Sequence, residues 1–143
     1  MRKIVFLFII IGLITHLQSI SQGTFHEVGN GNVQNQSNTY PSIYGNYYRG
    51  VKNQFLIKAS EMQAAGMSAG NITGLAFDVV TTSGATLEDL QIELKSTAQT
   101  SITTWDNNNL TSVYGPVNYV DQSGWNQHNF SNPFYWDGTS NIL

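Results

Sequence analysis

The segment Gly66–Gly70 contains a motif that could carry nucleophilic catalysis. Its residues, GMSAG, match the G-x-S-x-G pattern in which hydrolases hold a nucleophilic serine, which here would be Ser68. That chemistry requires a strand before the turn and a helix after it, so that the serine is strained and exposed. Here the expected helix precedes the motif and the expected strand follows it. We therefore interpret the two glycines as a helix end followed by a turn, and we expect no catalysis at Ser68.

Histidine could act as a base or as a metal ligand, but this chain has only three histidines and no cysteine. His16 lies in a predicted leader peptide, which leaves His26 and His128. A three-histidine zinc site is therefore excluded, as are thiolate metal sites, thiol catalysis and disulfides. His128 shares strand parity with Phe130, so we expect it to be a half-buried packing residue.

Carboxylate and amide oxygens occur together in the run Asp106–Asn109, whose sequence is DNNN. Such oxygens are the ligands that calcium takes, so Asp106 and Asn108 are candidate ligands of a structural calcium ion. The run lacks the glycine that an EF-hand loop requires, which excludes that class of site. The sequence indicates no other cofactor.

Four tyrosines lie within nine residues of a segment rich in glycine and asparagine. They are Tyr40, Tyr44, Tyr47 and Tyr48, and Arg49 follows them. Rings that carry hydroxyl groups beside amides suit a carbohydrate or peptide surface. Alternatively, the rings cover one end of a sheet core, because large aromatic side chains usually stabilise proteins by burial. A flat exposed platform would favour ligand binding, and buried rings would favour the structural role.

The composition restricts the function classes further. Charged residues make up 10% of the chain, against about 25% in ordinary soluble domains. A nucleic-acid-binding protein would need a surplus of lysine and arginine, which is absent. A coiled coil or long helical bundle would need far more glutamate, lysine and arginine. The chain is therefore expected to be a polar but weakly charged domain with no nucleic-acid partner.

The N-terminus has the features of a secretory signal peptide. A short basic start precedes the unbroken apolar run Ile4–Ile14, which is too short for the roughly 20 residues that span a bilayer. Small residues follow at Ser19 and Ser21, so we expect cleavage after residue 21, with a membrane anchor as the less favoured alternative. The mature part, residues 22–143, would keep four of the six basic residues against nine acids, a net charge of 4 − 9 = −5. It would be secreted or cell-surface, with no membrane span after processing.

The mature part reads mostly as β-strands. Residues 72–80 and 90–95 alternate between apolar and polar side chains, as expected of a sheet with one solvated face. Further short strands are expected at residues 24–28, 54–58, 110–114, 117–120 and 125–130, with turns at 121–124 and 137–138. This pattern predicts an all-β fold, an antiparallel β-sandwich or jelly roll.

One short helix is expected at residues 60–65. Ser60 and Gln63 have the spacing of a capping box, and Gly66 suits the left-handed residue that ends a helix. The last residues, Asn141–Leu143, look like the start of a further strand. We therefore expect the module to be truncated and the natural polypeptide to continue.

Three pieces of the chain resemble an N-terminal β-sandwich module of large secreted and surface proteins of Bacteroidetes-type bacteria. The pieces are Tyr40-Pro41 with the tyrosine-rich loop, residues 54–79 (QFLIKASEMQAAGMSAGNITGLAFDV) and residues 124–143 (GWNQHNFSNPFYWDGTSNIL). The resemblance implies a module that follows the signal peptide. It also implies downstream fibronectin type III, polycystic-kidney-disease-type or catalytic domains, and a type IX secretion sorting domain at the far end. It implies no catalytic residues.

We therefore expect a non-catalytic β-sandwich module of an exported multidomain protein, which serves adhesion, spacing or substrate docking. Its expected partners are the downstream domains of the same polypeptide, with glycans or surface proteins as further candidates. A carbohydrate-binding module that uses the Tyr40–Tyr48 loop is the alternative. A hydrolase domain, which would need Ser68 beside His128, is a remote one.

Overall fold

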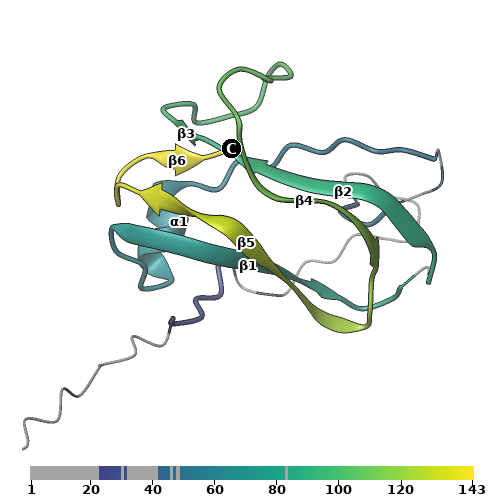
Figure 1. Cartoon of the computed structure of the whole chain (residues 1–143). Helices are drawn as coiled ribbons and strands as arrows, with labels where there is room; N and C mark the ends of the chain where they lie inside the picture. The colour runs from purple at the N-terminus through teal and green to yellow at the C-terminus, as the bar shows by residue number, and fades with distance from the viewer. Residues whose placement is uncertain (1–22, 30, 32–41, 46, 48, 83) are drawn as a thin grey trace, which may run out of the picture.

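The computed structural model describes residues 23–29, 31, 42–45, 47, 49–82 and 84–143. The predicted signal peptide lies outside these residues, as do Tyr40 and Tyr48. The described part contains the elements α1 (Ala59–Ala64), β1 (Gly70–Val79), β2 (Thr86–Leu94), β3 (Ser96–Thr97), β4 (Thr111–Val120), β5 (Gly124–Trp136) and β6 (Asn141–Ile142) (Figure 1). The predicted all-β class with one short helix is confirmed.

The strands form three antiparallel pairs, β1 with β5, β2 with β4, and β3 with β6. Figure 1 shows the β1–β5 and β2–β4 ribbons as two separate pairs, which the short turn between β4 and β5 connects. The arrangement of these pairs as two packed layers, as in a sandwich or jelly roll, stays a prediction.

The alternating segments form strands as predicted. Residues 72–79 lie in β1, and residues 90–94 end β2 with Leu90, Ile92 and Leu94 turned inward; each strand ends one residue before the predicted boundary. Lys95, which the alternation places in solvent, is partly buried beyond the end of β2. Within β1, Gly74 has no room for a side chain, because a Cβ there would lie 2.8 Å from the carbonyl oxygen of His128 on β5.

The strand β4 corrects one prediction. Residues 110–114 and 117–120 are not two strands but one, which continues through Gly115 and Pro116. Its pairing with β2 shifts register near Leu90 and Ile92, and this irregularity accommodates the glycine-proline pair within a continuous strand.

The strand β5 is longer than the predicted strand 125–130 and extends to Trp136. Proline within a strand is usually confined to edges and bulges, because it has no backbone N–H to donate. Here the register jumps from Gly74–Asn129 to Ile72–Phe134, so Pro133 lies in the irregular stretch between them.

Two predicted strands are wrong. Residues 24–28 form no strand, and residues 54–58 form only a single bridge, in which Ile57 and Ile142 exchange backbone hydrogen bonds of 2.8 and 2.9 Å. Apolar and aromatic side chains favour an extended backbone in both segments, but a strand also needs a partner along its length. Neither segment has one among the described residues.

The helix α1 begins one residue earlier than predicted. Ser60 and Gln63 do not cap it; instead the Glu61 carboxylate accepts a hydrogen bond of 2.9 Å from the backbone N–H of Lys58, the residue before the helix. Gly66 ends the helix as predicted, with a φ of 85°. No helix in the described part of the chain has the length and apolar character needed to cross a bilayer.

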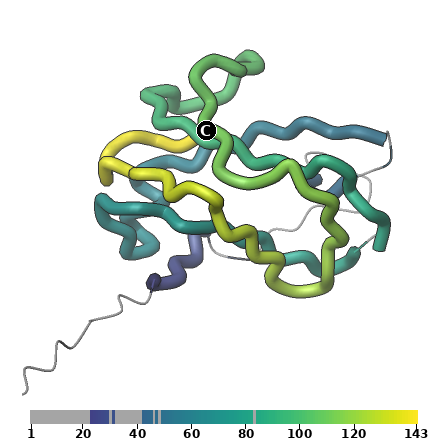
Figure 2. Tube along the Cα trace, in the orientation of Figure 1, coloured from purple at the N-terminus to yellow at the C-terminus, as the bar shows by residue number. Residues whose placement is uncertain are grey.

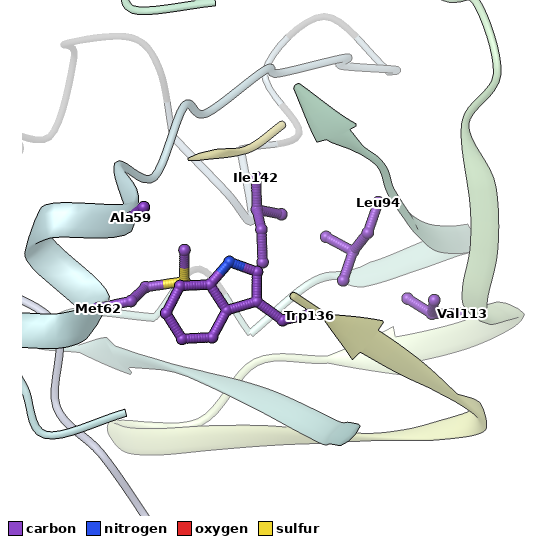
Figure 3. Packing of buried hydrophobic residues seen from close by; sticks show 6 residues of the cluster. All are labelled: Ala59, Met62, Leu94, Val113, Trp136 and Ile142. Carbon is purple, nitrogen blue, oxygen red and sulfur yellow. The ribbon is translucent and has the colours of Figure 1, made fainter. Parts of the chain in front are cut away.

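The hydrophobic core lies where α1 meets the ends of several strands (Figure 3). It consists of Ala59, Met62, Leu94, Val113, Trp136 and Ile142. Trp136 is fully buried, and its indole Nε1 donates to the carbonyl oxygen of Ser140 at 2.7 Å. The predicted strand at the chain end is present as β6, and the backbones of Leu143 and Lys95 exchange two hydrogen bonds of 3.0 Å.

Candidate functional site

His128 lies in a cage of aromatic rings on the inward side of β5. It is 1% exposed. The surrounding rings, with their centroid separations from the imidazole, are Tyr114 (4.7 Å), Tyr119 (4.8 Å), Tyr44 (5.9 Å) and Phe77 (6.3 Å). Sequence parity predicted a half-buried packing residue; in the structure, the side chain is buried completely.

One hydrogen bond joins His128 to the tyrosine segment. The hydroxyl oxygen of Tyr44 lies 2.6 Å from Nε2 of His128. Among the described residues, Nδ1 of the ring has no hydrogen-bond partner. Burial lowers the pKa of His128, so the ring is held neutral. Burial also raises the pKa of Tyr44, with Tyr119 and Asp121 adding to the rise, so the hydroxyl keeps its proton. The hydrogen bond between Tyr44 and His128 has a structural role, because it holds the tyrosine segment against β5. It does not suit general-base catalysis, because both groups are buried and cannot exchange a proton with solvent.

A second buried polar residue closes the turn between β4 and β5. Asn126 is 2% exposed, and its Oδ1 accepts hydrogen bonds of 2.8 Å from the Tyr119 hydroxyl and the Gln122 N–H. Its Nδ2 donates to the carbonyl oxygens of Gln122 and Gly124. Sequence reasoning placed a turn at 121–124 but missed Asn126. Its strand parity with His128 was the signal that could have found it.

The four-tyrosine segment does not form one platform among the residues that the structure describes. Tyr44 is 7% exposed, stacks on Tyr119 and faces His128, whereas Tyr47 is 81% exposed. Arg49 is exposed and has a φ of 65°. The structural role, which was the favoured prediction for these rings, therefore applies to Tyr44.

The calcium candidates lie on the loop over residues 98–110, which projects from the strands (Figure 2). The Asp106 carboxylate lies 2.5 Å from the ammonium group of Lys95, and the same ammonium donates to the Asn108 carbonyl oxygen at 2.9 Å. The side-chain amide of Gln99 donates to the same carboxylate oxygen, Oδ2 of Asp106, at 3.0 Å. The Lys95 hydrogen bond is the largest cause of the lowered pKa of Asp106. In this structure, the ammonium group of Lys95 contacts the carboxylate of Asp106 and the carbonyl oxygen of Asn108, the two residues predicted as calcium ligands.

Ser68 and His128 are not brought together. Ser68 is exposed in the turn between α1 and β1, two residues before Gly70, which pairs with Trp136 at the end of β5. His128 pairs with Leu75, near the other end of the same ladder.

The outward face of β1 and β5 carries amides and two large aromatic rings. The register places Gln127 opposite Ala76 and Asn129 opposite Gly74, and the two amides share a hydrogen bond of 2.7 Å. Trp125, opposite Asp78, is 52% exposed, and Tyr135, opposite Asn71, is 65% exposed. Phe25 packs edge-on against Trp125, with ring centroids 5.2 Å apart.

An open hollow of about 420 Å³ adjoins this face at its Tyr135 end. Its lining includes Lys95, Thr97, Asn109, Thr111, Phe134 and Tyr135. The hollow thus lies where β3, the beginning of β4 and the end of β5 meet. Sequence reasoning missed it, because its residues come from three distant segments and each is ordinary by itself.

Comparisons of the chain with protein-family models, curated proteins and solved structures found no match. The binding sites proposed for this chain therefore rest on its own residues and their geometry.

Proposed function

We propose that this chain is a non-catalytic β-sandwich module of an exported multidomain protein, and that it docks that protein on an extracellular surface or substrate. The apolar run Ile4–Ile14 and the resemblance to surface-protein modules support export. The observation that carries the docking role is the outward face of β1 and β5.

This face has the chemistry of a contact surface for an uncharged polar partner. Trp125 and Tyr135 leave half or more of their side chains in solvent, although such rings gain free energy when covered. Gln127 and Asn129 between them offer both hydrogen-bond donors and acceptors. Apart from the buried His128, Asp78 is the one acidic or basic residue in the two strands. Gly74 and Ala76 add no bulk opposite the amides, which favours a flat face.

The buried state of His128 supports a non-catalytic role. A general base must reach its substrate and titrate near the working pH. His128 is 1% exposed and its pKa is lowered by burial, so the ring stabilises the fold instead of contacting a substrate.

Co-sedimentation tests this function. The purified chain is mixed with microcrystalline cellulose, chitin and bacterial peptidoglycan sacculi, and the bound fraction and released sugars or amines are measured. We expect retention on at least one polymer without release of products. Trp125→Ala should lower retention by about tenfold, since it removes an exposed aromatic ring from the face. The matched control is Trp105→Ala, which removes a 47% exposed tryptophan from the projecting loop. Absence of retention on all three polymers, or turnover of any of them, would contradict the proposal.

A carbohydrate-binding module that uses the tyrosine segment is the second candidate. The exposure of Tyr47 favours it, because an exposed tyrosine can stack on a sugar ring. Tyr47→Ala would then reduce polymer retention, while Trp125→Ala would leave it unchanged.

A further inference from the structure

We propose that the hollow beside Tyr135 is a binding site for a neutral saccharide. This inference rests on the proposed docking function and names its ligand class and its site. The described residues of loop 40–48, where the sequence suggested a carbohydrate site, do not line it.

The size and position of the hollow suit a small ligand. Its volume of about 420 Å³ falls within the range of about 300–1,000 Å³ that is typical of ligand pockets. It is open to solvent and adjoins the amide-bearing face of β5, so a polymer could lie along the face with one or two sugar units in the hollow.

An aromatic ring borders the hollow and is available for stacking. Tyr135 is 65% exposed, and the next residue, Trp136, anchors this end of β5 in the core. Phe134 also lines the hollow and packs partly buried against the same core. The backbone beside Tyr135 is therefore held by buried neighbours, which limits the ordering that a ligand must impose. Sugar rings present apolar C–H faces that pack well on such aromatic surfaces.

The polar lining matches hydroxyl groups. Thr97 and Thr111 each carry a hydroxyl, which can donate and accept a hydrogen bond, and Asn109 carries an amide, which can do the same. The Thr97 oxygen accepts from the Gln99 N–H at 3.1 Å, which leaves its own O–H able to donate. Groups of this dual kind recognise the hydroxyl groups of a sugar better than they recognise an ion.

The charge of the lining selects against an anionic ligand. Lys95 is the one charged residue of the lining, and its ammonium is occupied by Asp106 at 2.5 Å and by the Asn108 carbonyl oxygen at 2.9 Å. An acidic sugar would have to compete with the Asp106 carboxylate for this ammonium. A neutral sugar can use the hydroxyl and amide groups without breaking the ion pair.

Titration calorimetry of the full chain with soluble trisaccharides tests the inference. The probes are cellotriose, xylotriose and triacetylchitotriose, with trigalacturonate as the anionic comparison. We expect at least one neutral trisaccharide to bind, and trigalacturonate to bind about tenfold more weakly or not at all. Tyr135→Ala should weaken binding by about tenfold. Thr111→Val, which exchanges a hydroxyl for a methyl of similar shape on an exposed strand position, should weaken it severalfold.

Two controls separate this site from the rest of the molecule. Tyr47→Ala removes another exposed tyrosine, and Trp105→Ala removes a 47% exposed ring from the projecting loop; neither residue lines the hollow. Both should leave trisaccharide affinity unchanged, and an unchanged far-UV circular dichroism spectrum verifies the fold of every variant. The inference is wrong if no neutral trisaccharide binds below about 10 mM, if trigalacturonate binds best, or if Tyr135→Ala binds like the unmodified chain.

Polymer retention and trisaccharide binding together distinguish a failure of the saccharide site from a failure of the docking function. If polymers retain the chain but no trisaccharide binds, docking holds and the saccharide site is wrong. If no polymer retains the chain and no trisaccharide binds, both are wrong.

Discussion

The hydroxyl of Tyr44 lies 2.6 Å from Nε2 of His128, although 84 positions separate the two residues in the sequence. Both side chains are buried, so the hydrogen bond forms away from water, where leaving either group unpaired is costly. It fastens the segment around residues 42–45 to the middle of β5. The pair thus connects the N-terminal part of the described chain to the strand that carries the proposed docking face.

Removal of this hydrogen bond should destabilise the fold. Tyr44→Phe retains the ring but leaves Nε2 of His128 buried without a partner. We expect the free energy of unfolding in urea to fall by about 1–3 kcal/mol. Tyr47→Phe makes the same chemical change at an 81% exposed ring and should alter stability by less than about 0.5 kcal/mol. Equal stability of the two variants would contradict a fastening role for Tyr44.

The stability of the domain should decrease in mild acid because of His128. Burial lowers the pKa of the folded ring below its ordinary value of 6.5. Between pH 7 and pH 5 the unfolded chain therefore binds more protons than the folded chain at this residue. The free energy of unfolding then falls as the pH drops through about 6.5. Carboxylates, with ordinary pKa values of about 4, contribute mainly below this range.

Urea unfolding at several pH values measures the effect. His128→Gln should show a flatter dependence between pH 7 and pH 5 than the unmodified chain, even if the variant is less stable throughout. A slope that His128→Gln leaves unchanged would show that another group causes the pH dependence.

Trp136 should be far more important for stability than Trp125. Trp136 is fully buried against Met62 and Ile142, whereas Trp125 is 52% exposed (Figure 3). We expect Trp136→Ala to lower the free energy of unfolding by about 3–5 kcal/mol, because it removes a large core side chain and leaves a cavity. Trp125→Ala should lower it by less than about 1 kcal/mol. Thermal unfolding followed by circular dichroism compares them, and a similar melting temperature for both would contradict this assignment of the core.

Gly115 should tolerate no side chain. Its φ is 76°, and a Cβ there would lie 2.0 Å from the carbonyl oxygen of Leu90 on the paired strand β2. Gly84 has a similar φ of 66°, but a Cβ there meets nothing within 4 Å. Gly84→Ala should therefore cost only the backbone strain of about 1–2 kcal/mol. Gly115→Ala adds a backbone clash and should destabilise clearly more, as measured by urea unfolding. Equal losses would show that β2 and β4 are not paired as described.

Export makes a separate prediction that concerns the N-terminus. If residues 1–21 are a signal peptide, the exported product begins at Gln22. N-terminal sequencing of protein from the culture medium or cell surface measures this directly. An exported product that still begins at Met1 would contradict the predicted cleavage.

The sequence by itself determined the features that depend on neighbouring residues. Alternation over 72–80 and 90–95 predicted β1 and the end of β2, and Gly66 predicted the end of α1. The turn at Asp137 was also predicted, since its carboxylate accepts the Thr139 and Ser140 N–H groups within a few residues. Such features arise from backbone preferences and side chains that lie close together in the chain.

Only the tertiary structure decided which segments have partners and which rings are buried. Residues 24–28 were a predicted strand but have no strand beside them among the described residues, while β5 continues past Pro133 because β1 remains paired beyond the irregular stretch. Tyr44 and Tyr47 are alike in sequence, yet one is buried against His128 and the other is exposed. The hollow beside Tyr135 likewise combines residues from three segments. These outcomes depend on contacts between residues tens of positions apart, and local periodicity carries no information about such contacts.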